Sequence, residues 1–123
     1  MKVLLDKCVD RRLAREIPGH EIQTVTGLGW ALVKNGELLV RAEGRFDAFV
    51  TVDRNLAFQQ ATHRFPFAVV ILHARSNRLA DLRPLVPRLL EVLPAAPGGK
   101  VTWIRTPALT DDIVRDTLDK TLR

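Results

Sequence analysis

Two aspartates that follow short apolar segments are the residues of this chain best suited to do chemistry together. Asp6 ends the run Val3-Leu4-Leu5, and Asp53 ends the apolar stretch that starts at Phe46. Carboxylate oxygens suit Mg²⁺ or Mn²⁺, and an ion held by them can polarise a phosphodiester and activate water. An aspartate after a strand is more often a turn or helix-cap residue, so the spacing alone leaves both roles open.

The elements that would position these acids alternate between strands and helices. Apolar or alternating runs predict strands at 3–5, 21–25, 46–52, 67–72 and 101–104. Amphipathic stretches predict helices at 10–17, 35–42, 79–93 and 110–122. Asn35 is the predicted cap of the second helix, and the third has a late start or a kink at Pro84 and Pro87. This alternation predicts an α/β fold with right-handed βαβ units and a mainly parallel sheet.

Ligands of such sheets bind outside the carboxyl ends of the strands. Asp6 and Asp53 therefore lie on the functional edge together, provided that their strands are neighbours. Arg75 and Arg78 follow the strand at 67–72 and lie at the same edge. These two arginines flank Ser76-Asn77 and would suit contacts with phosphate groups. A helix start capped by Ser76 or Asn77 is the alternative.

Length and composition indicate one domain that spans residues 1–123, with a core over 1–105 and a terminal helix at about 110–122. About 46% of the residues are hydrophobic, which is enough for a core. The single cysteine, Cys8, excludes a disulfide within the chain and favours a reducing compartment. We expect its thiol to be buried and unreactive.

The first apolar run is too short for a signal peptide, and no run approaches the roughly 18 apolar residues of a membrane span. We therefore expect a cytoplasmic protein that does not enter a membrane. The formal net charge is +5 and the pI is about 10.1. Such a charge permits binding to a polyanion and is equally compatible with an ordinary basic surface.

Three segments of the chain resemble a PIN-like family. The start Leu4-Leu5-Asp6-Lys7-Cys8-Val9 resembles the LLDE-type opening of that family. The segments 35–39 and 46–56 resemble its core motif, in which an acidic helix start precedes a Val-Thr-x-Asp strand end. The resemblance covers roughly residues 1 to 75. It implies a three-layer α/β/α sandwich.

PIN-like proteins include the VapC-type toxins, so the resemblance implies a metal-dependent endoribonuclease, a hydrolase that is the toxin component of a toxin–antitoxin pair. The implied partners are an RNA substrate and a small antitoxin protein. The implied catalytic residues are Asp6 and Asp53. The implied ligands of Mg²⁺ or Mn²⁺ are Asp6, Asp53, Asn35, Asn55 and Glu37, and the implied RNA contacts are Arg54, Arg75 and Arg78.

Two departures from the family pattern reduce the number of carboxylates expected at the metal site. Asn35 stands where the family usually has an aspartate, and Lys7 stands where a glutamate usually follows the first aspartate. Because each lost carboxylate removes a strong attraction for the cation, we expect weak metal binding. The alternative function is a catalytically weak or inactive PIN-like binding module that acts through a protein partner or nucleic acid. A homodimer through the 79–93 helix or Trp103 is compatible with either function.

Overall fold

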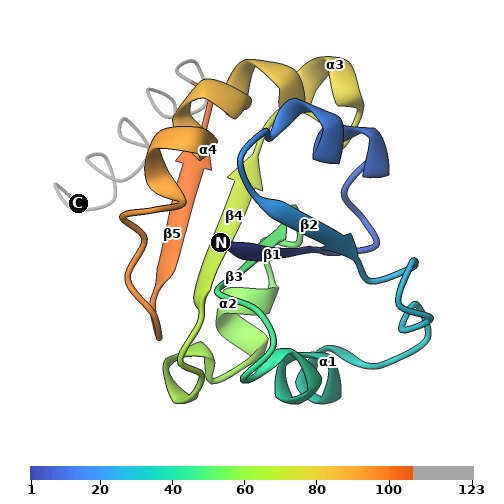
Figure 1. Cartoon of the computed structure of the whole chain (residues 1–123), viewed down its shortest axis with the longest axis vertical. Coiled ribbons are helices and arrows are strands. Elements are labelled where there is room, and N and C mark those ends of the chain that lie inside the picture. Colours follow the sequence, from blue (N-terminus) through green and yellow to red (C-terminus); the bar gives the residue numbers. More distant parts are fainter. Residues whose placement is uncertain (107–123) are drawn as a thin grey trace, which may run out of the picture.

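Five parallel strands form the central sheet of the computed structural model, which describes residues 1–106 (Figure 1). The strand order is β2-β1-β3-β4-β5, and all four pairings are parallel. The strands are β1 (Lys2–Leu5), β2 (Glu21–Thr24), β3 (Ala48–Thr51), β4 (Ala68–His73) and β5 (Val101–Arg105). The α/β class with a parallel sheet is confirmed. The helix predicted at about 110–122 lies outside the described residues.

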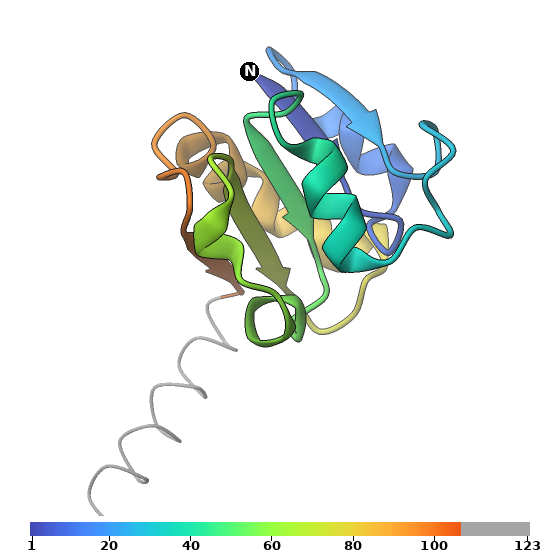
Figure 2. The same cartoon turned by 90° about the horizontal axis from the view of Figure 1, so that it is seen from below.

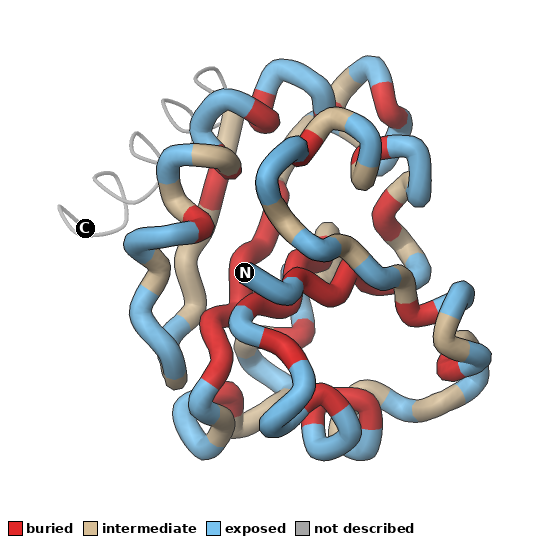
Figure 3. The backbone as a smooth tube through the Cα atoms, in the orientation of Figure 1, coloured by how far each residue is buried: buried red, intermediate tan, exposed pale blue. Residues whose placement is uncertain are grey.

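Side chains of the strands alternate between two apolar cores, one on each face of the sheet. Leu4, Phe49 and Val69 point to one face, which we call the α1 face. Their neighbours Val3, Val50 and Val70 point to the other, the α4 face. Successive residues of a strand face opposite ways, so a sheet covered on both faces needs the continuous apolar runs of the sequence. Figure 3 shows these strands as the buried centre of the described chain.

Helices cover both faces, which makes the architecture a three-layer α/β/α sandwich (Figure 2). On the α1 face lie α1 (Asn35–Ala42), α2 (Leu56–Gln59) and the 3₁₀ turn η2 (Thr62–Arg64). On the α4 face lie the 3₁₀ helix η1 (Arg11–Glu16), α3 (Leu79–Leu82), the 3₁₀ turn η3 (Arg83–Leu85) and α4 (Val86–Val92). Among residues 1–106, no helix is long and apolar enough to cross a membrane.

Two helical segments differ from the predicted form for local reasons. The segment predicted as a helix at 10–17 is the tighter η1, which starts where the Asp10 carboxylate accepts a hydrogen bond from the Arg12 backbone N–H. The segment predicted as one helix at 79–93 is broken into α3, η3 and α4. Pro84 lies at the break, because it has no N–H to donate and its ring crowds the preceding turn. The predicted kink is confirmed, and the late start is not observed.

The four connections between the strands do not share one hand. The chain moves outward from β1 to β2 across the α4 face, then returns to β3 and on to β4 across the α1 face. The last step, from β4 to β5, continues in that returning direction but crosses the α4 face. It therefore has the opposite hand to the other three, and the prediction of right-handed units throughout is wrong. This path lets α3 and α4 cover Val70 and Leu72, which would otherwise face water.

Removing the Phe49 ring should test the α1-face core. Phe49 is fully buried, whereas Phe58 on α2 is 82% exposed. We expect Phe49→Ala to lower the free energy of unfolding by about 3–5 kcal/mol and Phe58→Ala to change it by less than about 0.5 kcal/mol, measured by urea denaturation. Equal losses in the two variants would contradict the packing described.

Candidate functional site

The two candidate aspartates lie where the strand order of the sheet reverses. The chain leaves β1 for β2 on one side and returns to β3 on the other, and β1 pairs directly with β3. Such a switch point is the usual ligand site of an open parallel sheet. Asp6 follows β1 directly, and Asp53 lies two residues beyond the end of β3. The condition that their strands are neighbours is therefore met.

Thr51 ties the two acidic strand ends together. Its hydroxyl donates to Oδ2 of Asp6 at 2.7 Å and accepts from the backbone N–H of Asp53 at 3.0 Å. Thr51 is fully buried, and Asp6 is only 4% exposed. The register pairs Leu5 with Val50, so the next residues along, Asp6 and Thr51, are side by side on the same face. A single hydroxyl thus orients one carboxylate and positions the backbone that carries the other.

Asp6 is held by further donors. The backbone N–H of Lys7 donates to its Oδ1 at 2.8 Å, and the Cys8 thiol lies 3.4 Å from its Oδ2. Burial raises the pKa of Cys8, and the neighbouring Asp6 charge adds to this effect, while the contact of the thiol with the Thr51 hydroxyl opposes it. The thiol is therefore protonated at neutral pH, which agrees with an unreactive cysteine.

Asp53 is contacted by two asparagines. The Asn55 backbone N–H donates to Oδ1 of Asp53 at 3.0 Å, and Nδ2 of Asn35 lies 3.4 Å from its Oδ2. The prediction that Asn35 caps α1 is wrong. The helix begins at Asn35 itself, Lys34 occupies the cap position, and the Asn35 side chain turns toward Asp53 instead.

A hollow of about 450 Å³, which we call the switch-point hollow, contains both acids. Lys7 and Lys34 border it as well, and Nζ of Lys7 donates to the Ala31 carbonyl at 2.8 Å. The lining of the hollow therefore includes two acidic and two basic residues. Its lining residues are Asp6, Lys7, Cys8, Val33, Lys34, Asn35, Val52 and Asp53.

The structure brings three of the five predicted metal ligands together, namely Asp6, Asp53 and Asn35. Glu37 is exposed on α1 and pairs with Arg41 one turn further along, Oε1 to Nη2 at 2.8 Å. Asn55 reaches Asp53 through its backbone, and its side chain borders the next hollow along the edge. Within residues 1–106, no group of three or more His, Cys, Asp or Glu side chains is arranged to hold a metal ion.

The predicted RNA-contacting arginines border different parts of the same edge. Arg54 lies beside Asp53 and donates from Nη1 to Nε2 of His73 at 2.9 Å. Arg75 is exposed on the loop after β4. Arg78, at the start of α3, borders a hollow of about 650 Å³ on the other side of Lys7 and Cys8, which we call the basic hollow.

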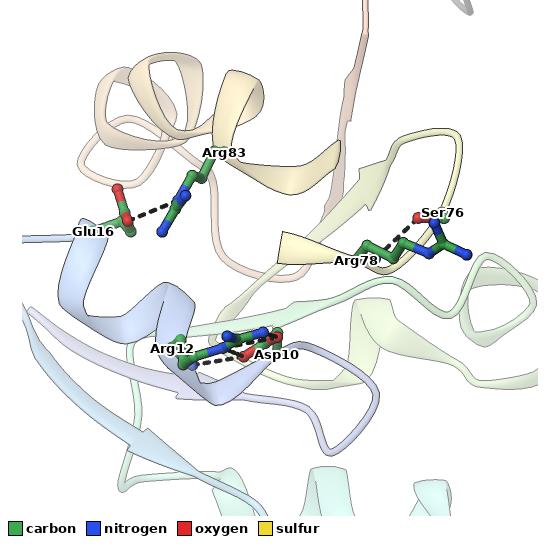
Figure 4. A network of polar contacts seen from close by, with 6 residues as sticks. All are labelled: Asp10, Arg12, Glu16, Ser76, Arg78 and Arg83. Carbon is green, nitrogen blue, oxygen red and sulfur yellow. Dashed lines mark hydrogen bonds and ion pairs between the residues drawn. The ribbon is translucent and has the colours of Figure 1, made fainter. Parts of the chain in front are cut away.

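Figure 4 shows how η1 and the start of α3 build the basic hollow. Arg12 pairs with Asp10 at 2.7 Å and holds the pKa of that carboxyl low, at about 2. Arg83 pairs with Glu16 at 3.0 Å. The backbone N–H of Arg78 donates to the Ser76 hydroxyl. This turn therefore involves the backbone of Arg78 and not its guanidinium group. The alternative in which Ser76 or Asn77 caps the helix is wrong, because the cap position of α3 is Arg78 and no side chain caps it.

Sequence reasoning missed Thr51 and Cys8 as structural partners of Asp6. The available signal was a hydroxyl residue inside the apolar run 46–52, where a buried polar group requires a partner. Comparison of the chain with protein-family models, with curated proteins and with solved structures found no match in any of the three. The site therefore rests on its geometry alone.

Replacing Thr51 by valine should separate the two strand ends. The substitution keeps the shape but leaves an Asp6 oxygen and the Asp53 N–H without this partner. We expect a loss of about 1–3 kcal/mol in the free energy of unfolding, measured by urea denaturation, and partial recovery in Thr51→Ser. Thr102→Val on the edge strand β5 is the matched control. Its half-buried hydroxyl makes no side-chain hydrogen bond within residues 1–106, and an equal loss there would contradict the bridge.

Proposed function

We propose that this chain is a divalent-metal-dependent endoribonuclease of PIN-like type. The observation that carries the proposal is that Asp6 and Asp53 line one hollow at the switch point of a parallel sheet. The resemblance of the segments around both acids to the PIN-like family supports the same reading. Hydrolysis of a phosphodiester needs neutralised phosphate charge and an activated water. This edge offers acids near Arg54 and Arg78, which form no ion pair within residues 1–106.

The donor set at the switch point fits a hard divalent cation. Asp6 and Asp53 supply carboxylate oxygens, and the Asn35 amide can offer its oxygen if it turns over at its 3.4 Å contact with Asp53. A bound Mg²⁺ or Mn²⁺ would supply Lewis acidity and an activated water. Hydrogen bonds from Lys7 N–H and Thr51 hold Asp6 in one orientation, which lowers the cost of ordering it on binding.

Charge predicts that such a site binds its cation weakly. The basic residues Lys7 and Lys34 line the hollow together with its two acidic residues. Sites with fewer charged ligands bind divalent ions less tightly, and a phosphate of the substrate would add the missing negative charge. We therefore expect metal and RNA to bind together better than either binds alone.

Lys7 and Cys8 border both the switch-point hollow and the basic hollow, so the two hollows adjoin. A nucleic acid backbone that crosses the first can meet Arg78 in the second. Arginine is well suited to phosphate because its planar fork donates two parallel hydrogen bonds. This arrangement supports Arg78 as a phosphate contact, with Arg54 on the opposite side of Asp53.

The wider biological proposal follows the resemblance. A ribonuclease of this type acts as the toxin of a toxin–antitoxin pair in the cytoplasm and is held inactive by a small antitoxin protein. Homodimer formation through Trp103 or the 79–93 segment is compatible with this role. Trp103 is half-buried on β5, an edge strand of the sheet.

A second candidate function is an RNA-binding module of the same fold without cleavage. It is favoured by the pairing of Glu37 with Arg41, which leaves the hollow with two carboxylates. The two functions share the binding surface and differ in hydrolysis, so an activity assay separates them.

Replacing Asp53 by asparagine should abolish cleavage while leaving the fold intact. We expect purified, antitoxin-free protein to cleave single-stranded RNA with Mn²⁺ present and to stop when EDTA is added. Asp53→Asn should lower the cleavage rate about 100-fold or more, since even outer partners of metal ligands contribute 10- to 100-fold. The measurement is the rate of product formation on a labelled RNA.

Asp47→Asn is the matched control for this experiment. Asp47 precedes β3 at the opposite, amino end of the sheet, where its Oδ2 accepts from the Lys2 backbone N–H at 2.8 Å. An amide oxygen can accept the same bond, so we expect wild-type rates. Unchanged cleavage in Asp53→Asn, or no cleavage by the wild type with Mn²⁺, would refute the nuclease; the latter result with RNA binding retained would favour the module.

A further inference from the structure

A third hollow, of about 500 Å³, lies beside Asp53 at the carboxyl ends of β3, β4 and β5. We call it the aromatic hollow, and it shares Val52 and Asp53 with the switch-point hollow. Of its residues, the proposed nuclease site uses only Asp53 and Arg54. Its lining residues are Val52, Asp53, Arg54, Asn55, Phe58, His73, Trp103 and Arg105.

Two aromatic residues line this hollow, of which Phe58 is exposed and Trp103 packs partly against the α1-face core. Phe58 is 82% exposed on α2, although its neighbour Leu56 is fully buried. Trp103 is half-buried on β5, and the Arg105 guanidinium lies 4.5 Å from the centre of its ring. Exposed rings beside cationic side chains are the usual platform for single nucleobases.

Two guanidinium groups give the hollow a positive potential. Arg54 donates to Nε2 of His73 at 2.9 Å, so this ring nitrogen accepts and the imidazole is neutral. Burial, then Arg54, then Arg105 lower the pKa of His73. Within residues 1–106, neither arginine forms an ion pair with a carboxylate. The two positive charges at this point are therefore available to an anion.

Two residues of the same hollow carry buried polar atoms that lack a partner in the described part of the chain. Nδ1 of His73 and Nε of Arg105 are buried and have no hydrogen-bond partner within residues 1–106. Because Nε2 of His73 accepts from Arg54, its Nδ1 carries the proton and is a donor. The guanidinium groups of Arg54 and Arg105 suit an acceptor-rich ligand, and a phosphate or the edge of a nucleobase is such a ligand.

From these features we infer that the aromatic hollow binds one unpaired nucleotide of the RNA strand, next to the phosphodiester that the Asp6–Asp53 pair would cleave. The base lies against Phe58 and Trp103, and the phosphate lies near Arg54 and Arg105. The inference rests on the proposed function for the identity of the ligand. A base stacked within a duplex has no free face for these rings, so the hollow selects single-stranded RNA.

Binding measured without metal tests this inference separately from cleavage. The full chain is titrated into a fluorescently labelled single-stranded RNA and into a duplex of the same sequence, both in EDTA, and the anisotropy is followed. We expect at least about tenfold tighter binding to the single strand. Phe58→Ala should weaken it by roughly 5- to 150-fold, as loss of one stacking ring does.

Two matched variants control for hydrophobicity and for charge. Leu32 is 98% exposed elsewhere on the surface, and Leu32→Ala should bind like the wild type. Arg54→Gln should reduce the slope of the logarithm of the binding constant against the logarithm of the salt concentration by about one, the value for one lost phosphate contact. Arg88→Gln removes the same charge from α4, where Arg88 pairs with Glu91, and should leave that dependence unchanged.

Equal affinity for single strand and duplex, or equal affinity of Phe58→Ala and Leu32→Ala, would overturn the inference. These outcomes differ from those that refute the nuclease. A protein that never cleaves but loses single-strand binding in Phe58→Ala has the nucleotide site without the proposed activity. A protein that cleaves with Mn²⁺ and shows an unchanged KM in Phe58→Ala has the activity without the nucleotide site.

Discussion

The hydroxyl of Thr51 is the contact on which the candidate site depends. It donates to the Asp6 carboxylate after β1 and accepts from the Asp53 N–H after β3, so it joins the two strands at the point where the sheet reverses its order. Because the group is fully buried, no water can take over either bond. The position of both acids, and of every hollow that adjoins them, follows from this pairing of β1 with β3.

Acidic and basic side chains occupy different parts of the carboxyl edge of the sheet. The acids lie between β1 and β3. Guanidinium groups that form no ion pair within residues 1–106 lie to one side at Arg54 and Arg105 and to the other side at Arg78. A strand of RNA is a polyanion that needs cationic contacts along its length and a neutralised centre where it is cut. The order of charges along this edge matches that need, and the two acids alone suit a weakly held cation.

The sequence predicted most of the fold because its strands are covered on both faces. Runs such as 67–72 have no polar interruption, and only a sheet between two helical layers buries both sides of them. It did not predict the opposite hand of the β4–β5 connection, since that depends on which face α3 and α4 must cover. Nor did it predict that the Asn35 side chain contacts Asp53 and does not cap α1. An asparagine side chain can form its hydrogen bonds in either position, so its residue type does not decide between them. Thr51 acquires its role only from the strand register, which no local pattern contains.

Calorimetric titration of Mn²⁺ into the wild type and into Asp53→Asn tests most directly whether the Asp6–Asp53 pair is a cation site. The geometry predicts one bound ion with a Kd on the order of 10⁻⁴ to 10⁻³ M, the range of sites with little ligand charge, and loss of that binding in Asp53→Asn. Equal binding by both proteins, or no binding by the wild type throughout that range, would contradict the account.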